Sequence, residues 1–300
     1  MLAAIVAAML APEFCRGAND KRPLRLAISV DTLAGANVND ARAAYLVWLR
    51  EVARYTGIQT AEVVPEVFIP SEDLIRDVRQ GLLDCYGATA PELAKLVDLT
   101  VPEEIVIQDY LAEGMEYVLL VHNSGPFKKV ADLRGAQIVS HLHRDMVLLP
   151  AWLGTMLASS GLPQPEHFFA SQKLSDKINQ VVLPVFFRRG DAACLARRNW
   201  EMAVELNPQL GRDLRPLAVS PKIIPIGFFF RRDTNPESRK ALIQSILTIS
   251  TLTAGQQIVA LYQSRAFVVR PLSAMRATLE MVRQFDRVSR QQPGARKGPA

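Results

Sequence analysis

The chain contains few of the residues from which metal sites and disulfide frameworks are built. Its 300 residues include three cysteines and four histidines, and no group of these has the spacing of a zinc site. The cysteines (Cys15, Cys85 and Cys194) are odd in number and widely spaced, so they predict no disulfide framework. Cys85 and Cys194 lie in apolar strand patterns and are expected to be buried free thiols.

Motifs of covalent catalysis and of cofactor binding are also missing. The chain has no G-x-S-x-G elbow, no Walker loop and no cysteine beside an evident base. A basic stripe interleaved with aromatic residues, which would indicate nucleic-acid binding, is absent as well. We therefore expect no cofactor and no nucleic-acid partner, and the sequence gives no positive sign of an enzyme.

A hydrophobic run long enough to span a bilayer is not present either. Residues 1–11 are almost wholly apolar, but the run is too short for a membrane helix and ends at Pro12. It has the character of the apolar part of a secretory signal, without the usual charged start. We expect residues 1–19 to be a signal-like segment and the mature protein to be periplasmic. Residues 12–14 form a poor lipid-attachment motif before Cys15, so a lipoprotein anchor is not expected.

The bulk composition is that of a globular protein. Hydrophobic residues make up 49% of the chain and charged residues 22%. The net charge of +5 suits a small anionic ligand, although ordinary surface lysines and arginines explain it equally well. At this length, two domains of moderate size are more favourable than one core.

The order of apolar patterns predicts two α/β lobes. In lobe one, strands are expected at 24–30, 61–69 and 82–88, and helices at 40–55, 71–81 and from Thr89 or Ala90. In lobe two, strands are expected at 137–140, 166–170, 191–195 and 215–219, and helices at 146–159, 174–187 and 199–206. Such alternation is typical of a mainly parallel sheet flanked by helices.

Two further strands, 116–121 and 223–231, link the lobes, and residues 236–290 are helical by period. The predicted division is lobe one at 20–117 plus 228–289, lobe two at 118–227 and a disordered tail at 290–300. Residues 112–121 and 221–231 would be the two hinge segments.

Four short phrases resemble those of one family of binding proteins. They are RQGLLDCYGA at 79–88, VADLRGAQIV at 130–139, RGDAA at 189–193 and LAVSPKIIPIG at 217–227. Their order and spacing resemble the periplasmic phosphate/phosphonate-binding family of the type 2 solute-binding superfamily, over residues 24–265. The resemblance implies a two-lobed type 2 fold whose lobes close around a small anionic solute. It also implies a monomer, and delivery to an ABC transporter permease or to a sensor ectodomain.

The chain departs from the family at one place. Where family members carry a Ser/Thr-rich loop that holds phosphonate oxygens, this chain reads SHLHRD at 140–145. Ser140 remains and the cluster of hydroxyls does not, so the identity of the solute is left open. Histidine and arginine side chains can still donate hydrogen bonds to an anion.

Ligands of open α/β sheets bind beyond the carboxyl ends of the strands, where helix N-termini favour an anion. Three loops meet this condition, at 31–40, 86–89 and 140–145, and Ser171 follows a further predicted strand. The candidate ligand-binding residues are Thr32, Asn37, Asn39, Tyr86, Thr89, Ser140, His141, His143, Arg144 and Ser171.

Several of these candidates also have an ordinary structural explanation. Asn39 can cap the helix that starts near residue 40, and Thr89 can cap its own helix. Asp191 caps a turn more readily than it orients a ligand amine. His141 and His143 can lie in a solvated loop, and a metal site is the weaker reading because no third ligand is evident.

Three functions are compatible with the pattern. The leading hypothesis is capture of a small anion by lobe closure. A sensory or partner-binding module of the same fold, which binds ligand poorly, is the alternative that the lost Ser/Thr loop favours. An enzyme on this fold is weaker, because no catalytic motif supports it.

Overall fold

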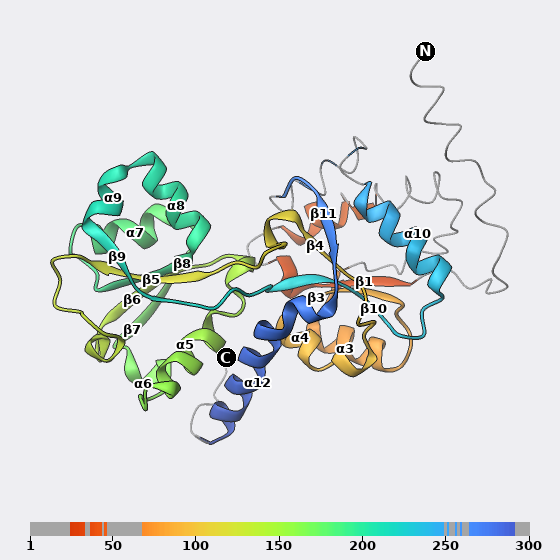
Figure 1. Ribbon diagram of the computed structural model, residues 1–300, viewed down its shortest axis with the longest axis horizontal. Helices are drawn as coiled ribbons and strands as arrows, with labels where there is room; N and C mark the ends of the chain where they lie inside the picture. Colours follow the sequence, from red (N-terminus) through yellow and green to blue (C-terminus); the bar gives the residue numbers. More distant parts are fainter. Residues whose placement is uncertain are drawn as a thin grey trace, which may run out of the picture.

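The structure is a computed structural model that places most of the chain in two lobes, each built on one sheet (Figure 1). It describes residues 25–33, 37–43, 45–46, 68–248, 251, 256, 259 and 264–291. The expectations for the signal-like segment, for Cys15 and for most of the tail fall outside these residues.

The sheet of lobe one has six strands in the order β11-β4-β10-β3-β1-β2. They are β1 (Leu26–Ser29), β2 (Phe68–Ile69), β3 (Cys85–Thr89), β4 (Ile105–Gln108), β10 (Ile226–Phe230) and β11 (Phe267–Arg270). β1 pairs in parallel with β2 and β3, whereas β10 pairs antiparallel with both β3 and β4. β3 and β4 therefore point the same way, and their carboxyl ends lie at the same edge as that of β1.

The sheet of lobe two has five strands in the order β7-β6-β8-β5-β9. They are β5 (Tyr117–His122), β6 (Gln137–His141), β7 (Ser171–Ser175), β8 (Ala192–Ala196) and β9 (Leu214–Val219). β6 pairs in parallel with β7 and β8, and β5 pairs antiparallel with β8 and β9. The two α/β lobes are confirmed. Four strands of each sheet point the same way, and β5, β10 and β11 run antiparallel to their neighbours.

Helices flank both sheets. They are α3 (Ser71–Arg79), α4 (Ala90–Ala94), α5 (Leu149–Ser159), α6 (Pro165–Phe168), α7 (Ile178–Phe186), α8 (Arg197–Leu206), α9 (Pro208–Asp213), α10 (Pro236–Leu247) and α12 (Arg276–Gln291). Short 3-10 turns follow several strands and include η2 (Val30–Leu33), η4 (Asp109–Leu111) and η6 (Arg144–Met146). Further 3-10 turns are η3 (Val97–Leu99), η5 (Val130–Leu133) and η8 (Leu272–Met275). Among the described residues, no helix is long and apolar enough to cross a membrane.

Two of the predicted elements are wrong. Residues 165–168 form helix α6 rather than a strand, because Pro165 at the first helical position favours a helix start; the strand follows as β7. Residues 267–270 form strand β11 inside the segment predicted to be helical, since they pair with β4 at the sheet edge. In addition, α12 extends to Gln291, so the first two residues of the predicted tail are helical.

The two segments that cross between the lobes run side by side. Met115 and Ile223 exchange backbone hydrogen bonds of 2.8 Å in both directions. Gly114, just before this bridge, has a φ of +74°, a conformation that glycine adopts without strain. Because Tyr117 begins β5 and Ile226 begins β10, we propose that the lobes divide at these crossings, a few residues from the predicted boundaries.

Helix α12 contacts both lobes. It packs against α4 of lobe one and α5 of lobe two (Figure 1). The hydroxyl of Thr278 on α12 also accepts a hydrogen bond of 2.8 Å from the backbone N–H of Ile224, which belongs to a crossing segment. Apolar residues of α12, α4 and α5 lie in one buried cluster that runs through both lobes. The lobes are therefore joined by packing as well as by the chain.

Cys85 in β3 and Cys194 in β8 are fully buried and unpaired, as predicted. Burial raises the pKa of both thiols far above the usual range. The two cysteines lie in different sheets, and neither has the reactive character of a nucleophile.

Candidate functional site

The carboxyl ends of the strands meet where the two lobes touch. The turn η2 follows β1 of lobe one, the turn η6 follows β6 of lobe two, and these two turns are in contact. We call this contact the junction. It is the position at which an α/β binder of two lobes holds its ligand.

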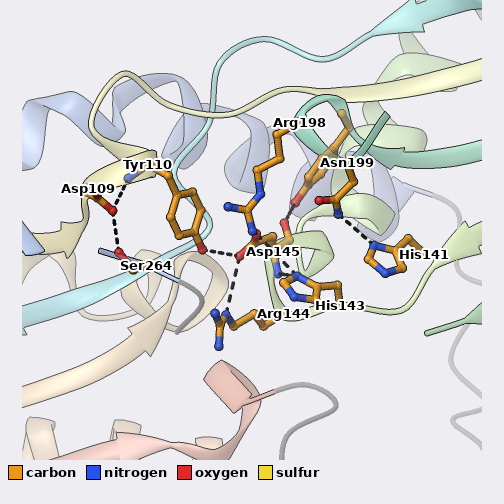
Figure 2. Close-up of polar contacts among 10 residues, drawn as sticks. Asp109, Tyr110, His141, His143, Arg144, Asp145, Arg198, Asn199 and Ser264 are labelled. Carbon is orange, nitrogen blue, oxygen red and sulfur yellow. Dashed lines mark hydrogen bonds and ion pairs between the residues drawn. The ribbon is translucent and has the colours of Figure 1, made fainter. Parts of the chain in front are cut away.

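Asp145 is at the centre of the junction and its side chain is fully buried. The Nη2 of Arg198 donates to one carboxylate oxygen at 2.9 Å, and the hydroxyl of Tyr110 donates to the other at 2.9 Å (Figure 2). The hydroxyl of Tyr117 donates to the backbone oxygen of Asp145. We refer to Tyr110, His143, Arg144, Asp145 and Arg198 as the Asp145 cluster.

The Asp145 cluster draws on both lobes. Tyr110 lies in η4, directly after β4 of lobe one, whereas Arg198 lies in the first turn of α8 in lobe two. The guanidinium carbon of Arg198 is 3.9 Å from the centre of the Tyr110 ring, which is a cation–π contact. Asp109 fixes η4 by accepting hydrogen bonds from the hydroxyl of Ser264 at 2.6 Å and from the backbone of Tyr110. The hydrogen bond from Tyr110 to Asp145 and the ring contact of Tyr110 with Arg198 together connect the two lobes at this point.

The two predicted histidines stack on each other, with ring centres 5.3 Å apart and ring planes within 10°. The Nδ1 of His143 accepts from the backbone N–H of Asp145 at 3.2 Å, which assigns the ring proton to Nε2. The Nδ1 of His141 faces the amide of Asn199 at 3.3 Å, and its Nε2 donates to the backbone oxygen of Asp176 at 3.3 Å. His141 is therefore held on both ring nitrogens by the protein itself, and His143 on one.

Burial lowers the pKa of both histidines below the usual value of 6.5, so both rings are neutral near pH 7. A histidine with a depressed pKa in the folded state contributes stability above its unfolded pKa, and this stability is lost as the pH falls below 6.5. We expect the free energy of unfolding to decrease on acidification from about pH 7.5 to about pH 5.5. In His143→Asn, whose side-chain oxygen replaces Nδ1 as the acceptor, the decrease should be smaller. Equal pH dependence of the two proteins in urea unfolding would contradict this expectation.

Arg144 supplies a second guanidinium beside Asp145. Its side chain is 3% exposed, and its Nε lies 3.9 Å from a carboxylate oxygen of Asp145. Ser140, at the carboxyl end of β6, is buried nearby in the same segment. The structure thus gathers four of the predicted residues, Ser140, His141, His143 and Arg144, at the junction.

The predicted hydroxyl groups of lobe one are engaged within the protein. Thr32 donates to the backbone oxygen of Ser29 at 2.8 Å. Tyr86 is fully buried, with its hydroxyl 2.5 Å from that of Thr100. Thr89 caps α4, and Glu92 accepts from both its backbone N–H and its hydroxyl at 2.7 Å.

Of the other predicted residues, Asn37 is used as a helix cap and Ser171 lies away from the junction. Asn37, rather than Asn39, caps the helix that covers residues 38–43, because its side-chain oxygen accepts from the backbone of Asn39 at 2.9 Å. Ser171 begins β7, so it lies at the amino end of that strand, opposite the ligand edge. Asp191 accepts a hydrogen bond from the backbone N–H of Gln137 at the same distant edge, which agrees with a structural role rather than contact with a ligand.

Carboxylates line the lobe-one side of the junction. Glu92 is buried and also accepts from the hydroxyl of Ser29 at 2.5 Å. Asp31 lies in η2, where partial burial and then the charge of Glu92 raise the pKa of its carboxyl group. The junction therefore combines cations of lobe two with anions of lobe one.

Sequence reasoning did not select Tyr110, Asp145 or Arg198. Arg198 could have been found, because it comes two residues after β8 and so at the carboxyl end of a strand. Tyr110 follows β4, which the apolar pattern did not reveal. Asp145 ends the predicted loop, but its role depends on partners that are far away in the sequence.

A groove of about 610 Å³ lies elsewhere, on lobe two between α7 and strands β6 and β7. Its lining includes Lys173, Leu174 and Phe187 and none of the Asp145 cluster. Arg144 and Asp145, by contrast, are buried at the junction.

Two lobes joined by two adjacent crossings, with polar groups at their facing strand ends, are the architecture of a two-lobed solute-binding protein. A family model for the periplasmic phosphonate-binding proteins of ABC transporters matches residues 36–270. The chain belongs to this family. A search among curated proteins finds no match.

Solved structures support the same fold. A binding-protein component of an ABC phosphonate transporter from Pseudomonas aeruginosa matches with a TM-score of 0.54 and 15% identity, over 93% of this chain and 91% of that one. PhnD1 from Prochlorococcus marinus, in complex with methylphosphonate, matches with a TM-score of 0.55 and 15% identity, over 88% and 99%. A Xanthomonas citri protein bound to ATP matches with a TM-score of 0.61 and 15% identity, over 90% and 99%.

Proposed function

We propose that the protein is exported to the periplasm, where as a monomer it captures a small oxyanion of the phosphonate class and delivers it to an ABC transporter permease. The observation that carries this proposal is the convergence of Arg144, Arg198 and His143 at the contact between the lobes. Guanidinium groups recognise tetrahedral oxyanions through several charge-assisted hydrogen bonds. A protein of the same fold that holds methylphosphonate makes this ligand class the first to test.

The proposed contact residues are Ser140, His143, Arg144 and Arg198 of lobe two. We do not include Thr32, Tyr86, Thr89 or His141, because their polar groups are bonded within the protein. Ser171 is left out because it lies at the wrong end of its strand.

Lobe closure is the proposed mode of capture. The two crossing segments, bridged at Met115 and Ile223, supply the hinge. Closure buries the guanidinium groups around the solute, where their hydrogen bonds are stronger than in water.

Ligand titration tests the proposal directly. The purified protein is titrated with methylphosphonate, phosphate, methanesulfonate and acetate, and both the melting temperature and tryptophan fluorescence are followed. Trp152 is a suitable reporter, because its ring centre is 5.9 Å from that of Tyr117, which holds the backbone of Asp145. A solute at about 100 times its Kd should stabilise the protein by about 2.7 kcal/mol.

A matched pair of variants locates the binding site. Arg144→Gln is expected to weaken binding by at least about tenfold, a change of about 1.4 kcal/mol. Arg134→Gln removes an exposed arginine that lies over the ring of Phe168 in lobe two, before β6, and should bind as the wild type does. If none of the anions produced a response, the proposal would be wrong, and the ligand-poor sensory or partner-binding module would be favoured instead.

A further inference from the structure

Asp145 is an unusual group to find among residues that would hold an anion. Its carboxylate is fully buried and accepts hydrogen bonds from Arg198 and Tyr110, with Arg144 and His143 close by (Figure 2). Guanidinium donors that could face a solute oxyanion are thus already directed to an anion that is part of the chain.

A solute cannot readily displace this carboxylate. The backbone N–H of Asp145 donates to His143, and its backbone oxygen accepts from Tyr117. Asp145 therefore keeps its place in η6 even if one guanidinium turns towards a ligand. Its negative charge stays beside any solute that Arg144 and Arg198 bind.

The groups that contact Asp145 come from three elements. Arg144 and His143 belong to its own segment, Arg198 to α8 and Tyr110 to η4. Across the junction, η2 and the start of α4 present Asp31 and Glu92. The elements of the junction thus carry two guanidinium groups and three carboxylates, and both histidines are neutral near pH 7.

We propose that Asp145 is a built-in counter-ion that makes the junction select oxyanions with a single negative charge over doubly charged ones. The preferred chemistry is a sulfonate or a singly ionised phosphonate. A single charge can share the guanidinium donors with Asp145, whereas a second charge is repelled by the carboxylates of both lobes. This inference rests on the proposed function, since it concerns the same site.

A pair of ligands of similar shape tests the inference on the wild-type protein. Methanesulfonate carries one negative charge throughout, whereas methylphosphonate gains its second charge between about pH 6 and about pH 8.5. We expect the Kd of methylphosphonate to rise about tenfold over this range while that of methanesulfonate stays constant. Methanesulfonate reports how protein protonation affects a singly charged ligand, so the ratio of the two Kd values follows the second charge of methylphosphonate.

Asp145→Asn removes the counter-ion and keeps the shape of the side chain. We expect this variant to bind methylphosphonate at the upper pH about tenfold more tightly relative to methanesulfonate. Tyr110→Phe is the matched control, because it removes a hydrogen bond to the same carboxylate and leaves the charge. The ratio of the Kd values of methylphosphonate and methanesulfonate should be the same in Tyr110→Phe as in the wild type.

The outcomes are distinct. Tighter binding of methylphosphonate by the wild type as the pH rises would overturn the counter-ion role and leave the proposed function intact. A ratio of the two Kd values that is the same in Asp145→Asn as in the wild type would have the same meaning. If that variant failed to fold, the pH series on the wild type would decide alone. Binding of neither ligand at any pH would overturn the proposed function together with this inference.

Discussion

Replacing Arg198 with methionine is expected to lower the free energy of unfolding by about 3 kcal/mol. The side chain of Arg198 is 30% exposed, whereas that of Asp145 is fully buried. The substitution leaves the buried carboxylate with one hydrogen-bond donor fewer. It also removes the cation–π contact with Tyr110. Methionine retains most of the apolar length of the side chain, so the change reports the charge rather than a cavity.

The neighbouring residue provides the control for this prediction. Arg197 lies on the same helix and pairs with Glu116 at 2.7 Å, but the two side chains are 35% and 27% exposed. Arg197→Met should therefore lower the free energy of unfolding by less than about 1 kcal/mol. Urea unfolding of the two variants compares them directly, and similar losses would argue that burial of Asp145 is not what makes its ion pair important.

Gly154→Ala should also destabilise the protein, by about 2 kcal/mol. In an exposed helix the same exchange would stabilise by about 1 kcal/mol, so the sign itself is informative. A Cβ at this position in α5 would lie 2.6 Å from Cε2 of Phe285 on α12 and 2.9 Å from the side-chain oxygen of Gln164. The aromatic ring would have to move away, and the packing of α12 on lobe two would loosen.

A double variant separates this clash from other causes. Phe285→Leu removes the ring atoms that the new Cβ would meet. Gly154→Ala should be much less destabilising in the Phe285→Leu background than in the wild type, and a thermodynamic cycle measures the difference. The same loss in both backgrounds would show that contact with Phe285 is not the reason for glycine at residue 154.

Most of the architecture could be predicted because strands and helices are marked by patterns of neighbouring residues in the sequence. Alternating apolar residues and helix ends placed most strands and helices, and the strand-end rule placed Ser140, His143 and Arg144 at the junction. The role of Thr89 was readable too, because threonine followed by glutamate three residues later is a helix-capping pattern, and the structure forms it. Strand β11 was not predicted, because it has only four residues and pairs at the sheet edge with β4, which is distant in the sequence.

The Asp145 cluster could not be predicted in the same way. Asp145 is separated from Tyr110 by 35 residues and from Arg198 by 53. No local pattern encodes which of many arginines of lobe two will meet this aspartate, or which tyrosine will reach it from lobe one. From the sequence, Asp145 is expected to lie in a solvated loop. Burial instead makes it the centre of a charge network.

In the proposed capture by lobe closure, helix α12 would affect the affinity although none of its residues is a proposed contact. Because it lies on α4 and α5 at once, separating the lobes requires this helix to bend, slide or leave one of its partners. The free energy of that deformation adds to the free-energy difference between the open and closed forms. The apparent Kd varies inversely with the fraction of molecules in the binding-competent form. Substitutions on the buried side of α12 would therefore change the apparent Kd of the proposed solute, because they change how much free energy the deformation of this helix costs.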